Sequence, residues 1–299
     1  MPNFSFKNDV QVRLVHKNAN GTDIRYNIVV SEISFAQTFQ EKSFEVKTLH
    51  NQSSFEGSVI NKANPAEFSL NTALLYDDRH RVVFDRLLDC DSFDLYISTQ
   101  SDDVWKLEKC VIQDGTFEIN KSRPLRLAIS GEASKLSKYT GTIPGNDFTY
   151  PAPIYVVPHI VTLTLGSDDI KDGVVGLSVE LQNDISWNNY KTIQGALSAT
   201  NAATSMYPSN FTIGTRVLAG SISKYLKDTS TSVLTWNDNA ALRMVVQHLP
   251  AGGRGLDFNI TNCSFTNRLS TPDVFREEFN WRMTQNPTAL SSVITYQTG

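Results

Sequence analysis

The five histidines are the first residues to consider, because imidazole nitrogens bind metals and transfer protons. They are His16, His50, His80, His159 and His248, and no two of them have the spacing of ligands in a metal motif such as HExxH. His16 and His159 lie near the ends of two predicted strands that open the two halves of the chain. We interpret both as polar strand ends and predict no bound metal.

A second group is the carboxylate cluster Asp168, Asp169 and Asp172, which loosely resembles a calcium-binding loop. The D-x-[DN]-x-[DN]-G pattern fails, because Ile170 stands where an oxygen ligand is needed and no glutamate follows at the required distance. The same residues suit a solvated turn between two strands. The sequence therefore predicts a hairpin turn at this place.

The remaining motifs that support chemistry are incomplete or absent. The glycine-rich segment Ala251–Gly255 (AGGRG) lacks the GK[ST] ending of a phosphate-binding loop, and no GxSxG nucleophile motif occurs. Cys90, Cys110 and Cys263 form no CxxC pair, which indicates neither a disulfide framework nor a zinc site and is typical of a reducing cytoplasm. We predict no catalytic residue, no cofactor and no enzymatic activity. An enzyme would need a carboxylate pair that only folding brings together.

The composition is that of a globular chain without a general affinity for nucleic acid. The 299 residues are 40% hydrophobic and 19% charged, so they can form one large or two medium domains. A net charge of −4 provides no basic excess for binding phosphates. No apolar run approaches the roughly 20 residues that span a bilayer, and the first residues lack the pattern of a secretory signal.

Short segments recur in the same order in the two halves of the chain. EISF at Glu32–Phe35 is matched by DISW at Asp184–Trp187, 152 residues later. PAEFSL at Pro65–Leu70 is matched by PSNFTI at Pro208–Ile213, 143 residues later. One match of six residues has little weight, but ordered matches at a nearly constant offset indicate an internal repeat.

Two later matches extend this repeat. FDLYI at Phe93–Ile97 corresponds to LRMVV at Leu242–Val246, and LEKCVI at Leu107–Ile112 corresponds to FNITNC at Phe258–Cys263. The order of the segments is preserved throughout. We therefore predict that the chain is an internal duplication of one strand-rich domain.

The repeat places the domain boundaries. We predict a first domain at 1–139, a linker at 140–158 and a second domain at 159–299. The linker contains four prolines and two glycines, a composition that suits an extended connection.

Each half opens with a predicted hairpin. Val10–His16 alternates apolar and polar residues, Asn18–Gly21 has turn chemistry, and Ile24–Val30 is the return strand. In the second half the same roles fall to His159–Leu165, Gly166–Gly173 and Val174–Leu181. Arg126–Ala133 and Phe275–Met283 are predicted closing strands, although the acidic run in the second of these would also suit a short helix.

One helix is predicted in the first half, at Asp77–Asp89. Val82, Val83, Leu87 and Leu88 fall on one side of it, and acidic residues stand at its start. Gly220–Asp228 is a weaker counterpart in the second half. The predicted fold is therefore mainly β with a short helix per domain, and each domain is a small β-barrel or β-sandwich.

This pattern resembles the tail-tube family of long-tailed bacteriophages, and within it most closely the baseplate tube proteins of T5-like siphophages, which carry two tube domains per chain. The resemblance rests on the opening hairpins at Val10–Val30 and Ile160–Leu181, the helix at Asp77–Asp89, and the late strands at Phe93–Ile97 and Leu242–Val246. It implies two tandem tail-tube-like domains and a structural role in the virion.

The resemblance also implies how the protein assembles. Six tube domains form a ring in this family, so three chains with two domains each would give a homotrimer with pseudo-sixfold symmetry. The implied partners are adjacent tail tube and baseplate hub proteins, and the implied location is the phage tail, after assembly in the host cytoplasm. DNA would pass through the lumen without specific binding, because acidic and small polar groups do not retain phosphates.

Between Phe35 and Pro65 lies a stretch of a length uncommon in compact domains. We predict that it contacts an adjacent ring or subunit, and that deletion of Lys47–Gly57 abolishes assembly without unfolding the domains. The second half has a related stretch at Trp187–Pro208.

An alternative function is a carbohydrate-binding or receptor-binding adhesin made of two β-sandwiches. An exposed Trp187 or Trp236 in a shallow cleft would favour this function, because aromatic side chains form sugar-binding platforms.

Overall fold

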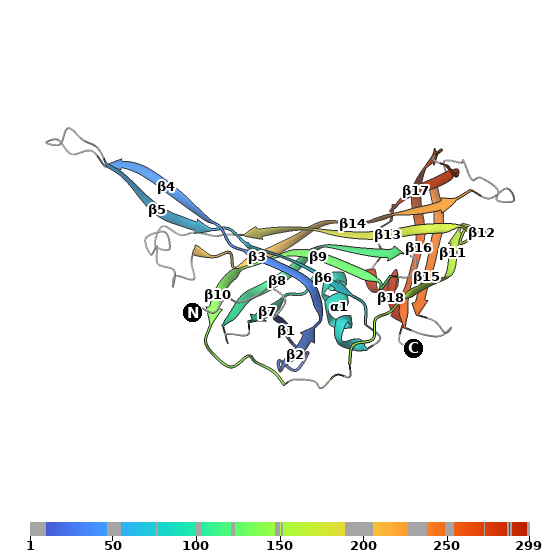
Figure 1. Ribbon diagram of the computed structural model, residues 1–299. Helices are drawn as coiled ribbons and strands as arrows, with labels where there is room; N and C mark the ends of the chain where they lie inside the picture. The colour runs from blue at the N-terminus through green and yellow to red at the C-terminus, as the bar shows by residue number, and fades with distance from the viewer. Residues whose placement is uncertain are drawn as a thin grey trace.

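The structure is a computed structural model in which β-strands dominate (Figure 1). It describes residues 10–46, 55–75, 77–99, 103–120, 123–146, 150, 152–188, 206–226, 238–248, 254–271, 273–285, 287 and 289–297.

The described elements up to residue 139 are ten strands, a 3-10 turn and one helix. They are β1 (Gln11–Lys17), β2 (Asp23–Ile28), β3 (Val30–Ala36), β4 (Phe39–Val46), β5 (Phe55–Ala63), β6 (Ala66–Ala73), η2 (Asp78–His80), α1 (Arg81–Asp89), β7 (Phe93–Ser98), β8 (Val104–Asn120), β9 (Arg126–Ala133) and β10 (Lys135–Tyr139). The described elements after residue 139 are β11 (Pro158–Leu165), β12 (Asp168–Asp169), β13 (Val174–Asn188), β14 (Asn210–Tyr225), β15 (Asp238–His248), β16 (Gly255–Ser270), β17 (Arg276–Met283), η4 (Leu290–Ser292) and β18 (Ile294–Gln297).

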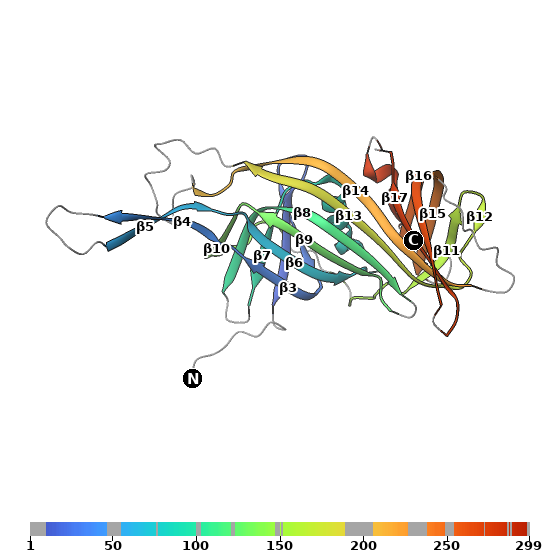
Figure 2. The ribbon, with the colours of Figure 1, turned by 90° about the horizontal axis from the view of Figure 1, so that it is seen from above.

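The long strand β8 connects the two halves of the chain. Its N-terminal part pairs with β7 on one edge and with β10 on the other. Its C-terminal part pairs with β9 on one edge and with β13, from the second half, on the other. Figure 2 shows the resulting sheet from above, with strands of both halves side by side. Within the described part of the chain the sheet stays open, so the predicted β-barrel or β-sandwich domains do not include a closed barrel.

The pairing order is the same in the two halves. Before residue 140 the neighbours run β3–β6–β9–β8–β7–β1, and after it they run β13–β14–β17–β16–β15–β11. The segments that echo each other also pair in the same register: Phe35 lies opposite Phe68, and Trp187 lies opposite Phe211. The short strands β10 and β18 likewise pair with the N-terminal parts of β8 and β16.

The predicted helix is confirmed, and it begins with a 3-10 turn. The α-helical part starts at Arg81, and the expected apolar residues Val82, Val83, Leu87 and Leu88 are all buried, together with Phe84. The acidic residues that were expected in the first helical turn lie before it instead, because the α-helix starts later than predicted.

A glycine on β8, Gly115, allows the helix to pack closely against this strand. A Cβ atom on Gly115 would collide with the Cδ2 methyl group of Leu87, so glycine favours this close approach of the helix to the strand. Second-half residues hold the end of the helix: Arg216 donates from Nη2 to the carbonyl oxygen of Leu88 at 2.6 Å and from Nε to Oδ1 of Asn183 at 2.7 Å. These charge-assisted bonds fix the end of the helix to the second half.

The second predicted hairpin is wrong. β11 is followed by the two-residue strand β12, which pairs back onto it, but β13 does not pair with β11. β13 lies between β8 and β14, where it is paired on both edges and buries Leu177, Val179 and Leu181. Pairing on both edges buries this apolar row more completely than a two-stranded hairpin would, which explains the difference.

The predicted helix at Gly220–Asp228 is also wrong. Residues up to Tyr225 belong to β14, and the last two residues of the predicted helix lie outside the described part of the chain. Leu218, Ile222 and Lys224 are buried in alternation with more accessible residues, which is the period of a strand paired with β13 and β17. The ambiguous segment at Phe275–Met283 is likewise a strand, β17, which buries Phe279 and Trp281.

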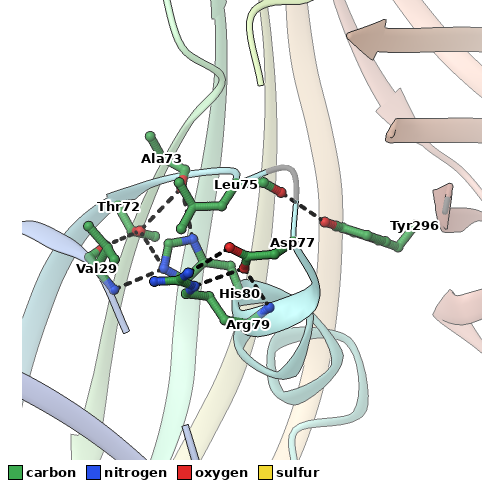
Figure 3. A network of polar contacts seen from close by, with 8 residues as sticks. All are labelled: Val29, Thr72, Ala73, Leu75, Asp77, Arg79, His80 and Tyr296. Carbon is green, nitrogen blue, oxygen red and sulfur yellow. Dashed lines mark hydrogen bonds and ion pairs between the residues drawn. The ribbon is translucent and has the colours of Figure 1, made fainter. Parts of the chain in front are cut away.

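A buried polar network holds the turn before α1 (Figure 3). His80 donates from Nδ1 to the carbonyl oxygen of Ala73 at 2.9 Å and accepts at Nε2 from the backbone N–H of Val29 at 3.0 Å. The Thr72 hydroxyl donates to the Val29 carbonyl oxygen at 2.6 Å. Burial lowers the pKa of His80 to about 4. The ring is therefore neutral near pH 7, which is the form that these hydrogen bonds require.

We expect this histidine to make stability fall in acid. Its pKa is lowered in the folded protein, so the unfolded chain, with a pKa near 6.5, binds the proton first as the pH falls. The stabilisation is complete above about pH 6.5 and is lost between there and pH 4, at about 1.4 kcal/mol per pKa unit, or roughly 3 kcal/mol. Denaturant unfolding at pH 7 and pH 4 measures this change.

The matched control is His80→Gln, whose amide can still accept from Val29 but does not titrate. The difference in free energy of unfolding between wild type and this variant should shrink by roughly 3 kcal/mol on acidification. A difference that stays constant with pH would contradict the assignment.

Candidate functional site

Eight neighbouring strands form one continuous surface across both halves of the chain. In spatial order they are β3, β6, β9, β8, β13, β14, β17 and β16. Their side chains alternate between the two faces of the sheet. On one face Leu70, Phe117, Val179 and Phe279 are buried, and α1 packs on this side (Figure 1). The opposite face is polar, and it is the candidate functional surface.

Hydroxyl groups pair across the strands of this polar face. The Oγ atoms of Ser34 and Ser69 lie 2.7 Å apart. In the second half, the Oγ atoms of Ser178 and Ser221 lie 2.8 Å apart. In each of these pairs the two hydroxyl groups satisfy each other's hydrogen bonding across neighbouring strands.

The charges on the polar face are mainly negative. The carboxylates are Glu32, Glu67, Asp114, Glu118, Glu132, Glu180, Asp184 and Glu278, and the guanidinium groups are Arg126, Arg268, Arg276 and Arg282. Two of the arginines are paired on the face itself, Arg126 with Glu118 at 3.5 Å and Arg276 with Glu278 at 3.6 Å. Burial and, after it, the neighbouring Glu67 carboxylate raise the pKa of Glu132. Because the carboxylates outnumber the guanidinium groups, the balance of charge on this face favours repulsion of phosphate.

Two strand edges bound the polar face. β3 pairs with β6 on one edge, and no described strand pairs with its other edge. The C-terminal part of β16 pairs with β17 on one edge, and its other edge also has no partner among the described strands. Unpaired edges of this kind are templates for another strand.

Comparison of β16 with β8 shows what is missing at this edge. Phe117 on β8 lies opposite Leu127 on β9, and Leu269 on β16 lies opposite Glu277, at the corresponding position on β17. Phe117 is 0% exposed, and β13 lies beside it, with Val179 opposite. No described strand lies beside Leu269 in this way, and Leu269 is 39% exposed. The C-terminal part of β16 therefore corresponds to the part of β8 that pairs with β13, but no described strand takes the place of β13 beside it.

A hairpin extends away from the sheet. β4 and β5 form a separate two-stranded sheet that projects beyond the rest of the molecule (Figures 1 and 2). The predicted long loop at Phe35–Pro65 is therefore mostly a hairpin, and Lys47–Ser54 lie outside the described residues. At its base, Ala63 packs with Met206 and Tyr207 of the second half.

The sequence-based candidates for chemistry do not come together. His16 stacks on Tyr26 with ring centroids 5.7 Å apart, and His80 belongs to the buried network. Asp168 and Asp169 form β12, so the predicted turn is partly a strand, and Lys171 Nζ lies 2.8 Å from Asp169. His50 and residues 251–253 of the glycine-rich segment lie outside the described part. Within that part, no cluster of three or more His, Cys, Asp or Glu side chains is placed to hold a metal ion.

The tryptophans do not form an exposed platform in the described structure. Trp187 is half-buried against Phe211, with ring centroids 5.3 Å apart, and Trp281 is buried. Trp236 lies outside the described residues. Sequence reasoning missed the polar face because alternation defines two faces of a strand but does not identify the one that meets the core.

No helix in the described residues has the length and apolar character needed to cross a membrane. A sequence model described as the Bacteriophage Baseplate Tube Protein Family matches residues 76–297, which is most of the chain. No curated protein matches the chain.

Proposed function

Because this chain belongs to the bacteriophage baseplate tube protein family, we propose that three copies of it close a hollow ring at the tip of the tail, through which DNA leaves the virion. Family membership makes it a structural component of the phage tail. The number of copies and the role as a DNA conduit are our proposals. The single observation that supports them is that the edges at the two ends of the polar face have no partner among the described strands.

The two halves act as two equivalent segments of the ring wall. We assign a first tube domain to 1–139, a linker to 140–158 and a second tube domain to 159–299, derived from one duplicated unit. The identical pairing order of the halves and the shared register of the echoed strands support this assignment. Three chains would supply six segments, which gives pseudo-sixfold symmetry.

The junction inside the chain provides the pattern for the junction between chains. β8 and β13 pair from Asp114↔Gln182 to Asn120↔Gly176, and this pairing joins the first half to the second. The equivalent strands are β16 and β3, because β16 occupies the place of β8 and β3 that of β13 in the pairing order. Pairing of β16 with β3 of the next copy therefore repeats the internal junction, and closure of the ring pairs both edges that bound the polar face.

The polar face lines the bore in this arrangement. The apolar residues of the opposite face are buried in the core, and α1 packs against them, so this side lies on the outside of the channel wall (Figure 1). A channel of hydroxyl groups and carboxylates lets DNA pass, because the carboxylates repel phosphates and the serines are already hydrogen-bonded to one another.

The partners of the ring are the neighbouring components of the tail. The hairpin β4–β5 projects beyond the ring segment, and it is the element that reaches an adjacent ring of the tail tube or the baseplate hub (Figure 2). Assembly takes place in the host cytoplasm. Two different axial neighbours require two different axial faces, which distinguishes a baseplate ring from a main tube made of identical stacked rings.

Imaging of the purified full-length chain tests the proposal. We expect hollow particles with a mass of three chains by light scattering and a central bore in electron micrographs. A chain that stays monomeric at every concentration, or that forms open fibres without a bore, would contradict ring closure.

A further inference from the structure

Val156, in the linker, completes the end of the first half. The backbone N–H of Leu74 donates to Leu125 O at 2.8 Å, Leu125 N–H donates to Val156 O at 2.9 Å, and Val156 N–H donates back to Leu74 O at 2.9 Å. The three residues form a closed cycle of hydrogen bonds. All are buried, at 2%, 1% and 0% exposure in the order Leu74, Leu125, Val156.

The second half contains two members of the same cycle. Leu226 follows β14 as Leu74 follows β6, and Phe275 precedes β17 as Leu125 precedes β9. The Leu226 N–H donates to Phe275 O at 2.9 Å, which repeats the first bond of the cycle.

The third member has no counterpart among the described residues. Val274 is 51% exposed and Phe275 is 54% exposed, whereas Leu125 is buried. Tyr225, next to Leu226, is 45% exposed. These exposed apolar side chains mark the end of the second half where the third member of the cycle would bind, and we call this place the Phe275 slot.

The position of the linker in the repeat identifies the segment that would fill this slot. Val156 lies just before β11, and β11 corresponds to β1: Leu163 lies opposite Met244 on β15, and Leu14 lies opposite Leu95 on β7. The segment that corresponds to the linker is therefore the one before β1, near residues 4–8. It reads Phe4-Ser5-Phe6-Lys7-Asn8, and its two phenylalanines have the spacing of one face of an extended strand.

We propose that the Phe4–Asn8 segment of one copy occupies the Phe275 slot of the neighbouring copy, as the linker occupies the first-half slot within the chain. This inference rests on the proposed ring. The described chain begins at Val10, just before β1, and β1 lies apart from β17 (Figure 1). In the ring, β3 of the neighbour lies beside β16, which brings the start of the neighbour to the slot.

Cysteine cross-linking tests this contact directly. Phe6→Cys combined with Val274→Cys should give, on oxidation, chains linked to one another up to a covalent trimer on a non-reducing gel. The native Cys90, Cys110 and Cys263 are all buried, so they add little background. Phe6→Cys with Asp168→Cys, which places the second thiol in an exposed turn elsewhere, is the matched control and should stay monomeric on the gel.

The outcomes separate this inference from the ring itself. Rings in micrographs without cross-linked chains would overturn the inference and leave the ring proposal standing. A disulfide that forms within one chain, rather than between chains, would have the same consequence. Absence of rings would overturn both. In a second measurement, the variant Phe4→Ser with Phe6→Ser should still form rings at high concentration. On dilution, however, half of its rings should dissociate at a protein concentration at least about tenfold higher than for the wild type. Unchanged ring stability would contradict the contact.

Discussion

Leu269→Lys is expected to abolish ring formation while the chain stays folded. In the single chain Leu269 is 39% exposed and lies opposite Glu277, so a lysine there keeps its hydration and meets a carboxylate. In the ring the same position corresponds to Phe117, which is 0% exposed beside β13. Enclosing an ammonium group between β16 and β3 costs several kcal/mol, and a ring of three copies contains three such junctions.

Light scattering at concentrations where the wild type forms rings measures this effect, and we expect the variant to be monomeric there. Val161→Lys is the matched control, because Val161 is 38% exposed and lies on β11, away from both edges. Thermal unfolding of both variants checks that the fold is kept. Rings of normal stability in Leu269→Lys would show that this edge is not the junction.

Reversal of two charges on the polar face is expected to make the ring bind DNA. Glu67 and Glu180 are exposed on this face, on β6 and β13. Glu67→Lys with Glu180→Lys would place two lysines per chain, hence six in a trimer, around the bore. Six phosphate contacts give a binding constant that falls about 10³-fold between 50 and 200 mM salt, whereas the wild-type ring should bind no DNA in this range.

Fluorescence anisotropy with a labelled duplex, repeated over a salt series, measures both the binding and its slope. Asp168→Lys with Asp172→Lys is the matched control, since it makes the same change of net charge in an exposed turn away from the polar face. We expect the control to bind far less tightly. Equal binding by the two variants would indicate that the polar face does not line the bore.

Much of the local structure was predictable from the sequence. The alternation in Val10–His16 and Arg126–Ala133 marked strands that the structure contains, because a strand at the surface of a core must alternate its side chains. The helix before Cys90 was found from the spacing of its apolar residues. The echoed segments also proved to pair in one register, which is a consequence of pattern and order together.

The choice of strand partners was not predictable in this way. Val174–Leu181 has the pattern of a hairpin return strand, but it pairs with β8, whose paired residues precede it by about sixty positions. Gly220–Tyr225 has few strong signals and becomes a strand because β13 and β17 both offer it an edge. Such choices depend on which edges remain free after the rest of the sheet has formed, and that is not a local property.

The sequence by itself determined the strands, the helix, the order of the repeated segments and the polar character of alternate residues. Only the tertiary structure decided that the polar rows of both halves join into one face, and that Leu269 remains exposed where Phe117 is buried. The physical reason is that side-chain alternation is set by the backbone of a single strand. The face that meets the core, and the edge that stays open for another chain, are set by contacts between residues far apart in the sequence.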